Sequence, residues 1–323
     1  MLDSILGSLQ VLALATKTDF RSVTSREVAL FQGPMGWAEF SPFLEYSCEE
    51  SIPWLVSAIE AAFAQTPPLV RGDIAVNATL PAIDDQSQIA HILDAFEGVS
   101  VVKIKVGTQI AADLARVAYV RQLRPLVKIR IDVNGLWSVK QAHEFLDQVG
   151  EIEYVEQPCS SIEELCELKK RCSVKIAGDE VIRKARDPFA LDLAGAIDIL
   201  MLKVAPLGGI SRAMQIARHH QLPVVVSSAL ESAVGISHGL KLAAALPELD
   251  FACGLGTGAL LAVDVAKIPI IKGTMRVGDV IPDIDAIEKY AVSSERLNWW
   301  RKRIRMTWNA GAQSITQERG WIS

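Results

Sequence analysis

Two lysines, Lys103 and Lys105, stand one residue apart in a strand-like run of β-branched residues at 101–106. Side chains alternate between the two faces of a strand, so both lysines share one face and Val102 and Ile104 share the other. If the apolar face packs on helices, the lysines point into the interior of a barrel. Burial and a like charge nearby both lower a lysine pKa, and a lowered pKa suits a general base. On this spacing alone, an exposed edge strand with two solvated lysines explains the pattern equally well.

Three carboxylates favour the buried interpretation. Asp132, Glu156 and Asp179 come at the ends of the next three strand-like runs, each about one βα unit further along the chain. The carboxyl ends of barrel strands meet at one rim, where barrel enzymes hold their active sites. Three converging carboxylates repel one another without a counter-ion, and their oxygens suit a hard cation. The pattern therefore predicts a Mg²⁺ site.

Further polar residues follow the same strand ends. A third lysine, Lys203, ends a run that is apolar on both faces, and it would lie across the mouth of the barrel from Lys105. Asn134 shares a strand face with Asp132. One later loop opens a helix whose N–H groups could bind an anion, and another contains glycines that permit close backbone approach. The remaining candidate residues are Glu180, Ser227, Ser228, Gly254, Gly256 and Thr257.

The elements that must position these residues are short β-branched runs that alternate with helical stretches, a pattern typical of βα units around a parallel sheet. Eight such runs predict an α/β barrel. We expect strands at 73–78, 100–106, 127–133, 152–156, 174–178, 197–204, 223–228 and 250–253. We expect helices at 111–124, 138–149, 161–171, 187–194, 209–219 and 231–246.

The two ends of the chain differ from the middle. Residues 1–72 combine a strand from about residue 9, a glycine–proline turn and a helix at about 48–65, which together predict an α+β segment. The tail at 281–323 has few strand signals. Its aromatic and basic cluster at 299–305 is typical of a surface helix with packed tryptophans, rather than of a membrane or nucleic-acid site.

The composition excludes several classes of protein. Half of the 323 residues are hydrophobic and 22% are charged, which indicates a globular protein with a large core. The net charge of −5 gives no footprint for nucleic acid or an anionic membrane. No apolar run reaches the roughly 18 residues of a membrane span, and the start has no secretory signal. We therefore expect a cytoplasmic protein that acts on a small molecule.

In their order along the chain, these motifs resemble the muconate-lactonizing subgroup of the enolase superfamily. Within that subgroup the o-succinylbenzoate synthases of the short actinobacterial type are the most similar. The resemblance covers about residues 70–260, and residues 36–42 resemble the capping domain of the family. The motifs are K-x-K at 103–105, D-x-N at 132–134, E-Q-P at 156–158, G-D-E at 178–180, the later lysine, and S-S-x-x-E-S-x-x-G at 227–235.

The resemblance implies a fold and a set of residue roles. The fold would be a (β/α)₇β barrel at 73–280 under an α+β capping domain built from 1–72 and 281–323. Mg²⁺, or Mn²⁺ in its place, would be bound by the three carboxylates. The other implied roles are Lys105 as the base, Lys103 as its neighbour, Lys203 as the cation on the opposite face, and Asn134 and Glu180 as groups beside the metal.

The implied reaction acts on a small-molecule carboxylate. It is the syn-dehydration of 2-succinyl-6-hydroxy-2,4-cyclohexadiene-1-carboxylate to o-succinylbenzoate in menaquinone biosynthesis. The sequence says nothing of the oligomeric state. It also has few residues for the mobile capping loop of longer relatives, so the segment 20–22 receives no role.

Several alternatives stay open. Racemisation of N-acylamino acids or epimerisation of dipeptides needs bases on both faces, which Lys105 and Lys203 would supply. The lack of an acidic residue at 253–257 favours the synthase over the epimerase. A non-catalytic barrel would have lost at least one of the polar groups, and a Schiff-base lyase would not need three carboxylates. A histidine base is disfavoured because none of the five histidines ends a predicted strand.

Overall fold

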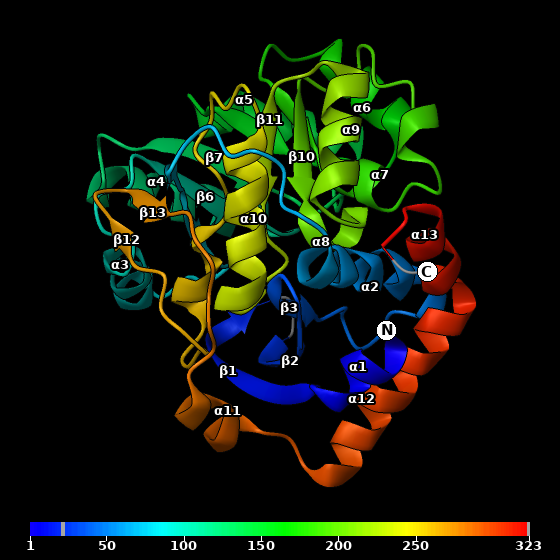
Figure 1. Cartoon of the computed structure of the whole chain (residues 1–323). Coiled ribbons are helices and arrows are strands. Elements are labelled where there is room, and N and C mark those ends of the chain that lie inside the picture. The colour runs from blue at the N-terminus through cyan, green and yellow to red at the C-terminus, as the bar shows by residue number, and fades with distance from the viewer. Residues whose placement is uncertain (21–22, 322–323) are drawn as a thin grey trace.

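The computed structural model describes residues 1–20 and 23–321. It consists of a curled sheet wrapped in helices and a smaller body built from both ends of the chain (Figure 1). Residues 21 and 22, within the segment 20–22 to which no role was given, lie outside the described residues. In the part of the chain that is described, no helix combines the length and the apolar character that a membrane span needs.

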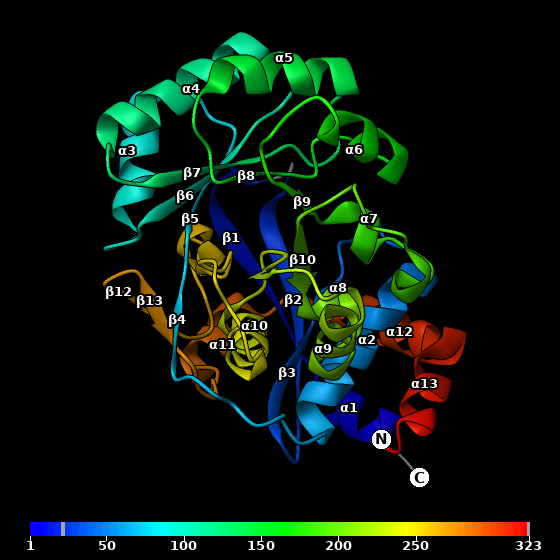
Figure 2. The same cartoon turned by 90° about the horizontal axis from the view of Figure 1, so that it is seen from above.

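A parallel sheet forms the centre of the larger body. Among the described residues, its seven strands follow the order β11-β10-β9-β8-β7-β6-β5, so neighbours in the sheet are also neighbours in the chain. Figure 2 shows how the sheet curls away from the outer helices. The strands are β5 (Ala78–Leu80), β6 (Val101–Lys105), β7 (Lys128–Asp132), β8 (Tyr154–Glu156), β9 (Ile176–Gly178), β10 (Ile199–Lys203) and β11 (Val224–Ser227). This arrangement confirms the α/β barrel class.

Two of the predicted strands differ from the structure. The run at 73–78 divides, because β4 (Asp73–Ala75) leaves the barrel and pairs antiparallel with β13 (Thr274–Arg276), which in turn pairs with β12 (Ile270–Ile271). The predicted eighth strand was wrong as a regular strand. Instead, Cys253 forms a single parallel bridge with Val76, just before the first barrel strand β5. The next residue, Gly254, forms a single parallel bridge with Ser227 of β11. The barrel still closes at this point, although only through isolated bridges.

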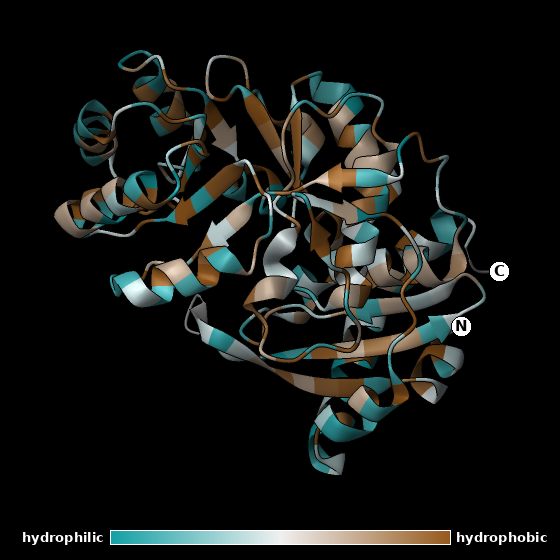
Figure 3. Ribbon diagram, turned by 90° about the vertical axis from the view of Figure 1, so that its left-hand side faces the viewer, coloured by the Kyte–Doolittle hydropathy of each residue, from teal (hydrophilic) through white to brown (hydrophobic). Residues whose placement is uncertain are grey.

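Helices cover the outer face of the sheet. Figure 3 shows the strands as largely hydrophobic ribbons and the surrounding helices with both hydrophobic and hydrophilic stretches. Helices α5 and α6 begin at serines that form capping boxes, which satisfy the first free N–H groups. The barrel helices are α3 (Gln86–Asp94), α4 (Ile110–Leu123), α5 (Val139–Val149), α6 (Ile162–Lys169), α7 (Glu180–Arg183), α8 (Val204–Leu207), α9 (Ile210–His220) and α10 (Ala233–Ala245).

The helix predictions contain two errors. The stretch at 187–194 is not an α-helix, because the Asp187 side chain accepts from Phe189 N and starts only a short 3₁₀ turn, η1 (Pro188–Ala190). Helix α3 was not predicted at all. It begins at Asp85, whose side chain accepts from the N–H groups of the second and third helical residues.

The smaller body, called the capping unit below, joins both ends of the chain. An antiparallel sheet of β1, β2 and β3 packs with α2 and with the tail helices around one core, in which Trp54 and Trp300 are fully buried. The tail therefore forms helices with packed tryptophans, as expected. Its elements are α1 (Leu2–Gly7), β1 (Gln10–Phe20), β2 (Val23–Gly33), β3 (Gly36–Phe40), α2 (Cys48–Phe63), α11 (Ile284–Tyr290), α12 (Ser294–Thr307), a π-helical turn η3 (Trp308–Ala312) and α13 (Gln313–Glu318). The domain limits at 72/73 and 280/281 stay predictions.

Two carboxylates of the capping unit hold it against the barrel. Glu60 of α2 accepts hydrogen bonds from Ile210 N and from Ser211 N at the start of α9. Glu39 of β3 accepts from Ser232 N and from other groups at the start of α10. A carboxylate at a helix N-terminus satisfies free N–H groups and complements the helix dipole. These contacts fix the capping unit over the carboxyl ends of the barrel strands.

Candidate active site

The carboxyl ends of the strands bring the predicted residues to one rim. Across β6, β7 and β8 the register pairs Lys105 with Asp132, and Asp132 with Glu156. Directly paired residues of adjacent strands point to the same face, so these three side chains form a row. Asp179 follows β9 and Lys203 ends β10, and both continue the row around the mouth of the barrel.

Buried ion pairs connect this row. Lys105 Nζ lies 2.8 Å from Asp132 Oδ2, and Lys103 Nζ lies 2.8 Å from Glu156 Oε2 and 3.3 Å from Asp132 Oδ2. None of these four residues is more than 9% exposed. Charged groups are buried only when they are paired, which these are. The alternative of an exposed edge strand with solvated lysines was therefore wrong.

A second charged group lies on the opposite side of the mouth. Lys203 Nζ lies 2.5 Å from Asp179 Oδ2, while Arg183 Nε donates to Asp179 Oδ1 at 3.1 Å. Arg183 Nη2 also donates to Glu180 Oε1 at 2.6 Å, an oxygen that accepts from Asn134 Nδ2 at 3.2 Å. Arg183 was not predicted as a residue of the site. The sequence does hold a signal for it, because Arg183 stands four residues after the predicted metal ligand Asp179. Side chains four residues apart meet on one face of a helix.

Asn134 connects the two charged groups. Its Oδ1 accepts a hydrogen bond from Lys105 Nζ at 2.8 Å, while its Nδ2 donates to Glu180. Its backbone lies in the left-handed region with φ 54°, which asparagine adopts more readily than most residues. The turn after β7 therefore aims the amide at the Lys105 ammonium.

Gln157, the middle residue of the E-Q-P motif, had been given no role. It directly follows Glu156 and is fully buried. Its Oε1 accepts from Asp179 N at 2.9 Å and from Val181 N at 3.2 Å, and its Nε2 donates to Cys159 O at 2.8 Å. One amide thus connects the ends of β8 and β9, which carry two of the three carboxylates.

The charges around Lys103 correct one expectation about pKa. Burial alone would lower the pKa of Lys103, but the carboxylates of Glu156 and Asp132 outweigh burial and raise that pKa above its ordinary value. Burial and the neighbouring lysine were expected to lower the pKa of Lys103 together, and this direction was wrong. Burial, and then the charge of Asp132, raise the pKa of Glu156. The rim therefore holds its carboxylates in a setting that favours an added cation.

The three carboxylates fit a hard divalent cation in chemistry, although each is paired with a basic side chain. Within residues 1–20 and 23–321, no three acidic, histidine or cysteine side chains are already arranged around a common metal position. Glu156 Oε1, however, is buried and has no hydrogen-bond partner. Such an oxygen is costly unless a donor or a cation satisfies it. This open oxygen and the three carboxylates together fit such a cation.

The later candidates line a small cavity at this rim. Ser227, Ser228, Gly254 and Thr257 lie around it together with the three lysines. Ser228 Oγ and Thr257 Oγ1 lie 2.6 Å apart in a hydrogen bond. A Cβ at Gly254 would lie only 2.6 Å from Ser227 Oγ, which explains the glycine. Gly256 was expected here as well, but it does not line the cavity.

The helix that follows β11 does not offer free N–H groups, contrary to expectation. Ala229 N donates to Glu231, and Ser232 N and Gly235 N donate to Glu39. Ala233 N donates to a carboxylate at residue 264. Carboxylates of the protein itself therefore already accept from the N–H groups at the start of this helix.

A larger cavity leads from this site to solvent. Its volume is about 1180 Å³, and it extends from Lys105 and Asn134 past α3 to Lys17 of the capping unit. Ligand sites for small molecules usually have volumes of about 300–1,000 Å³. A small carboxylate can therefore reach Lys105 without movement of the barrel.

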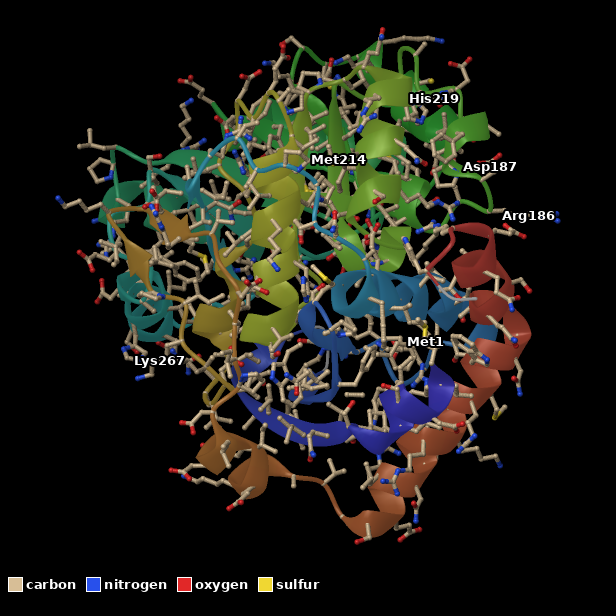
Figure 4. The ribbon with its side chains drawn as sticks, viewed as in Figure 1. Met1, Arg186, Asp187, Met214, His219 and Lys267 are labelled. Carbon is tan, nitrogen blue, oxygen red and sulfur yellow. The ribbon has the colours of Figure 1, made fainter. Side chains whose placement is uncertain are left out.

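Among the described residues, no histidine lines the small cavity at the rim, and His91 lines the larger cavity that leads to Lys105. Figure 4 shows His219 near the end of α9 that points away from the capping unit, whereas the rim faces the capping unit. His238 of α10 is buried, and its Nε2 lies 3.2 Å from Trp37 O. Burial, and then the nearby Lys241 cation, lower the pKa of His238 to about 4.

We expect His238 to make the protein less stable in acid. The pKa of His238 is lower in the folded than in the unfolded protein, so protonation at low pH favours the unfolded state. The stability that depends on a neutral His238 is complete above about pH 6.5 and is lost as the pH falls toward 4. Between pH 7.5 and pH 5 this amounts to about 2 kcal/mol of unfolding free energy. Urea unfolding at both pH values should show the loss in the wild type and a smaller loss in His238→Gln. The same loss in both proteins would contradict the prediction, because other groups would then cause it.

Comparison with known proteins identifies the family. The family model described as enolase C-terminal domain-like matches residues 88–279, and the model described as enolase N-terminal domain-like matches residues 11–62. The chain belongs to the enolase superfamily. An o-succinylbenzoate synthase of Mycobacterium ulcerans (strain Agy99) is 48% identical over 311 residues, which is 94% of each chain. One of Mycobacterium tuberculosis (strain ATCC 25618 / H37Rv) is 47% identical over the same share of both chains.

Solved structures of the superfamily share this fold. The muconate lactonizing enzyme of Pseudomonas putida has a TM-score of 0.72 at 20% identity, and covers 88% of this chain and 98% of its own. The muconate lactonizing enzyme of Pseudomonas fluorescens has a TM-score of 0.75 at 19% identity with the same coverage. These likenesses confirm the enolase-type fold, and the Mycobacterium relatives confirm the resemblance to o-succinylbenzoate synthases.

Proposed function

We propose that this chain is a divalent-metal-dependent o-succinylbenzoate synthase that dehydrates 2-succinyl-6-hydroxy-2,4-cyclohexadiene-1-carboxylate. The observation that carries the proposal is the placement of Lys105 against Asp132 on one side of the mouth, and of Lys203 against Asp179 on the other. The likeness to enzymes of that name along 94% of the chain supports the choice of substrate. The pathway, menaquinone biosynthesis, and the cytoplasmic location belong to the same proposal.

Lys105 is the proposed base. Asn134 and Asp132 hold its ammonium group by two hydrogen bonds of 2.8 Å, which fixes the direction in which the amine points. In its neutral form the amine would take the proton on the carbon next to the ring carboxylate. The same ammonium would then give a proton to the departing hydroxyl on the same ring face. One C–H and one C–O bond break, the ring becomes aromatic and water leaves. Positioned proton transfer contributes about 10²–10⁴ in rate.

Lys203 and Lys103 are proposed to act as fixed cations. Lys203 ends β10, which lies three strands from β7 in the sheet, whereas Lys105 ends β6, next to β7. A substrate ring bound between the two lysines would therefore meet them on opposite faces. A buried cation there stabilises negative charge that spreads into the ring. Lys103 Nζ lies 2.8 Å from Glu156 Oε2 and 3.3 Å from Asp132 Oδ2, so it would serve as a cation beside the ligands rather than as a base.

Asp132, Glu156 and Asp179 are the residues that would hold the metal, which we propose to be Mg²⁺ or Mn²⁺. When bound, such an ion stabilises the negative charge that develops on the substrate carboxylate. Gln157 and Arg183 would keep the ligand Asp179 in place, through its N–H and its Oδ1 respectively. Asn134 and Glu180 lie beside this set rather than within it.

The direct test is incubation of the purified protein with the cyclohexadiene carboxylate and Mg²⁺, while product absorbance is followed. Formation of o-succinylbenzoate at a rate far above that of a protein-free control is the expected result. Absence of product, with folded and metal-loaded protein, would refute the proposal.

We expect the activity to disappear in excess EDTA and to return on addition of Mg²⁺ or Mn²⁺. The three lysines are already paired with the three carboxylates, so their charge is partly neutralised. Without a metal, the site therefore has no strong electrophile to stabilise the negative charge that develops on the substrate carboxylate. The far-ultraviolet circular dichroism spectrum in EDTA serves as the control for folding. Full turnover by metal-free, folded protein would contradict the prediction.

Racemisation of N-acylamino acids is a second candidate, favoured by the two opposed lysines. A 1,1-proton transfer needs a base on each face, and Lys105 and Lys203 lie on opposite sides of the mouth. Exchange of the α-proton of an N-acylamino acid enantiomer in deuterated solvent, with inversion, would support it. A rate below that of the dehydration by several orders of magnitude would make it at most a side activity.

A further inference from the structure

Arg26 of the capping unit reaches the wall of the small cavity that holds the three lysines. It lies on β2 and is only 2% exposed. Its Nε donates to Leu230 O at 3.2 Å, and its Nη2 donates to Ser41 O. Its guanidinium also lies over the ring of Phe43, 4.5 Å from the ring centroid. One side chain of the capping unit therefore contacts a barrel loop and an aromatic residue of its own unit.

Leu230 and Phe43 both line this cavity, and they form part of its apolar side. Leu230 has a backbone φ of 64°, a region that leucine rarely adopts. A residue stays in such a conformation only where its surroundings hold it there. Two contacts do so here, because Arg26 binds the Leu230 carbonyl and Glu231 Oε2 accepts from Ala229 N at 2.6 Å.

Burial lowers the pKa of Arg26 and outweighs three acidic residues, Glu39, Glu231 and Glu45, that attract its charge. Glu39 and Glu231 are themselves buried. Glu39 in turn binds Ser232 of the same barrel loop. A buried charged cluster contributes little net stability compared with apolar packing, but it requires a defined geometry. The cluster therefore fixes how the loop at Leu230 lies against the capping unit.

We propose that Arg26 is a positioning residue that sets the apolar wall of the active site. By holding Leu230 and Phe43, it fixes the surface that the six-membered ring of the substrate meets with its carboxylate toward the lysines. The cavity has a volume of about 20 Å³ in this structure, so it must widen to admit the ring. The inference rests on the proposed function. It predicts an effect on binding of the ring rather than on proton transfer, because the contacts of Arg26 within the described residues go to Leu230, Ser41 and Phe43.

The test compares Arg26→Gln and Arg26→Lys with the wild type. We expect KM for the substrate and Kd for o-succinylbenzoate, measured by calorimetry with Mg²⁺ present, to rise at least about 10-fold in Arg26→Gln, since loss of an apolar contact surface weakens binding by about that factor. The kcat should stay within about 3-fold, since a loss of uniform binding raises KM alone. Arg26→Lys keeps one donor and should recover part of the loss.

The control variant is Glu60→Ala. It also removes a contact between the capping unit and the barrel, but at α9 rather than at the cavity. It should lower the midpoint of urea unfolding and leave KM and the product Kd unchanged. If Glu60→Ala raises KM as much as Arg26→Gln does, the effect belongs to the interface in general and the proposal is wrong.

A double-mutant cycle with Leu230→Ala tests whether Arg26 acts through the wall. Loss of the leucine side chain should raise KM by itself, and the Arg26→Gln substitution should then add little, because coupled residues are not additive. Fully additive effects would overturn the proposal, as would wild-type KM and Kd in both Arg26 variants. If Arg26→Gln does not fold, Arg26→Lys and its cycle with Leu230→Ala provide the same decision.

Failure of this inference differs from failure of the proposed function. If the wild type neither binds o-succinylbenzoate nor forms it, the proposed function fails. If the wild type does both and the Arg26 variants match it, only the role of Arg26 fails.

Discussion

Replacement of Lys105 by arginine should abolish dehydration, with a loss of at least about 10³-fold in kcat. Arginine keeps the positive charge beside Asp132, but it does not give up its proton near neutral pH and so cannot act as the base. Exchange of the substrate proton next to the carboxylate with deuterated solvent should disappear as well. Both rates are measured on the same Mg²⁺-loaded protein, by absorbance and by proton nuclear magnetic resonance.

Lys203→Arg provides the contrast that assigns the two roles. If Lys203 acts as a cation opposite the ring, arginine preserves that charge, and dehydration should remain measurable although the larger guanidinium reduces it. Lys140→Arg, on an exposed helix face, serves as the matched control and should behave like the wild type. A Lys105→Arg enzyme that dehydrates at nearly the wild-type rate would refute the mechanism. If proton exchange survives in Lys105→Arg and disappears in Lys203→Arg, the two roles are reversed.

The parts of the site that could be predicted follow from regular periods. The alternation of side chains along a strand placed Lys103 and Lys105 on the inner face, and the repeat of βα units placed Asp132, Glu156 and Asp179 at one rim. The structure brings these five together as buried, paired charges. Strand alternation and the βα repeat depend only on local sequence, which explains why the positions of these residues could be predicted.

The parts that could not be predicted depend on contacts between distant segments. Arg26 and Leu230 are far apart in the chain, and no local pattern indicates that they meet. Because the capping unit packs on α10, Glu39 also accepts hydrogen bonds from Ser232 N and Gly235 N at the start of that helix. These N–H groups had been expected to be available to an anion. The pKa of Lys103 was predicted in the wrong direction for the same reason, since the carboxylates of other strands outweigh its burial.

Replacement of Glu156 by glutamine should weaken metal binding and catalysis together. The substitution keeps the shape of the side chain but removes one ligand charge, while Glu156 Oε1 is the buried oxygen that now has no partner. Changes in groups that only support a metal ligand cost about 10–100-fold in affinity, so loss of a ligand charge should cost no less. Binding of Mn²⁺, measured by electron paramagnetic resonance in the absence of substrate, gives the affinity without reference to activity.

The fold should survive this change, which makes the metal result decisive. The amide oxygen can still accept from Lys103, whose Nζ also stays 3.3 Å from Asp132 Oδ2, so no buried cation is left without a partner. Glu153→Gln is the matched control. It changes the same residue type just before the same strand, but Glu153 pairs with Lys128 and Arg130 away from the rim, so the Mn²⁺ affinity should stay unchanged. If Glu156→Gln binds Mn²⁺ as tightly as the wild type does, Glu156 is not a ligand and the metal lies elsewhere.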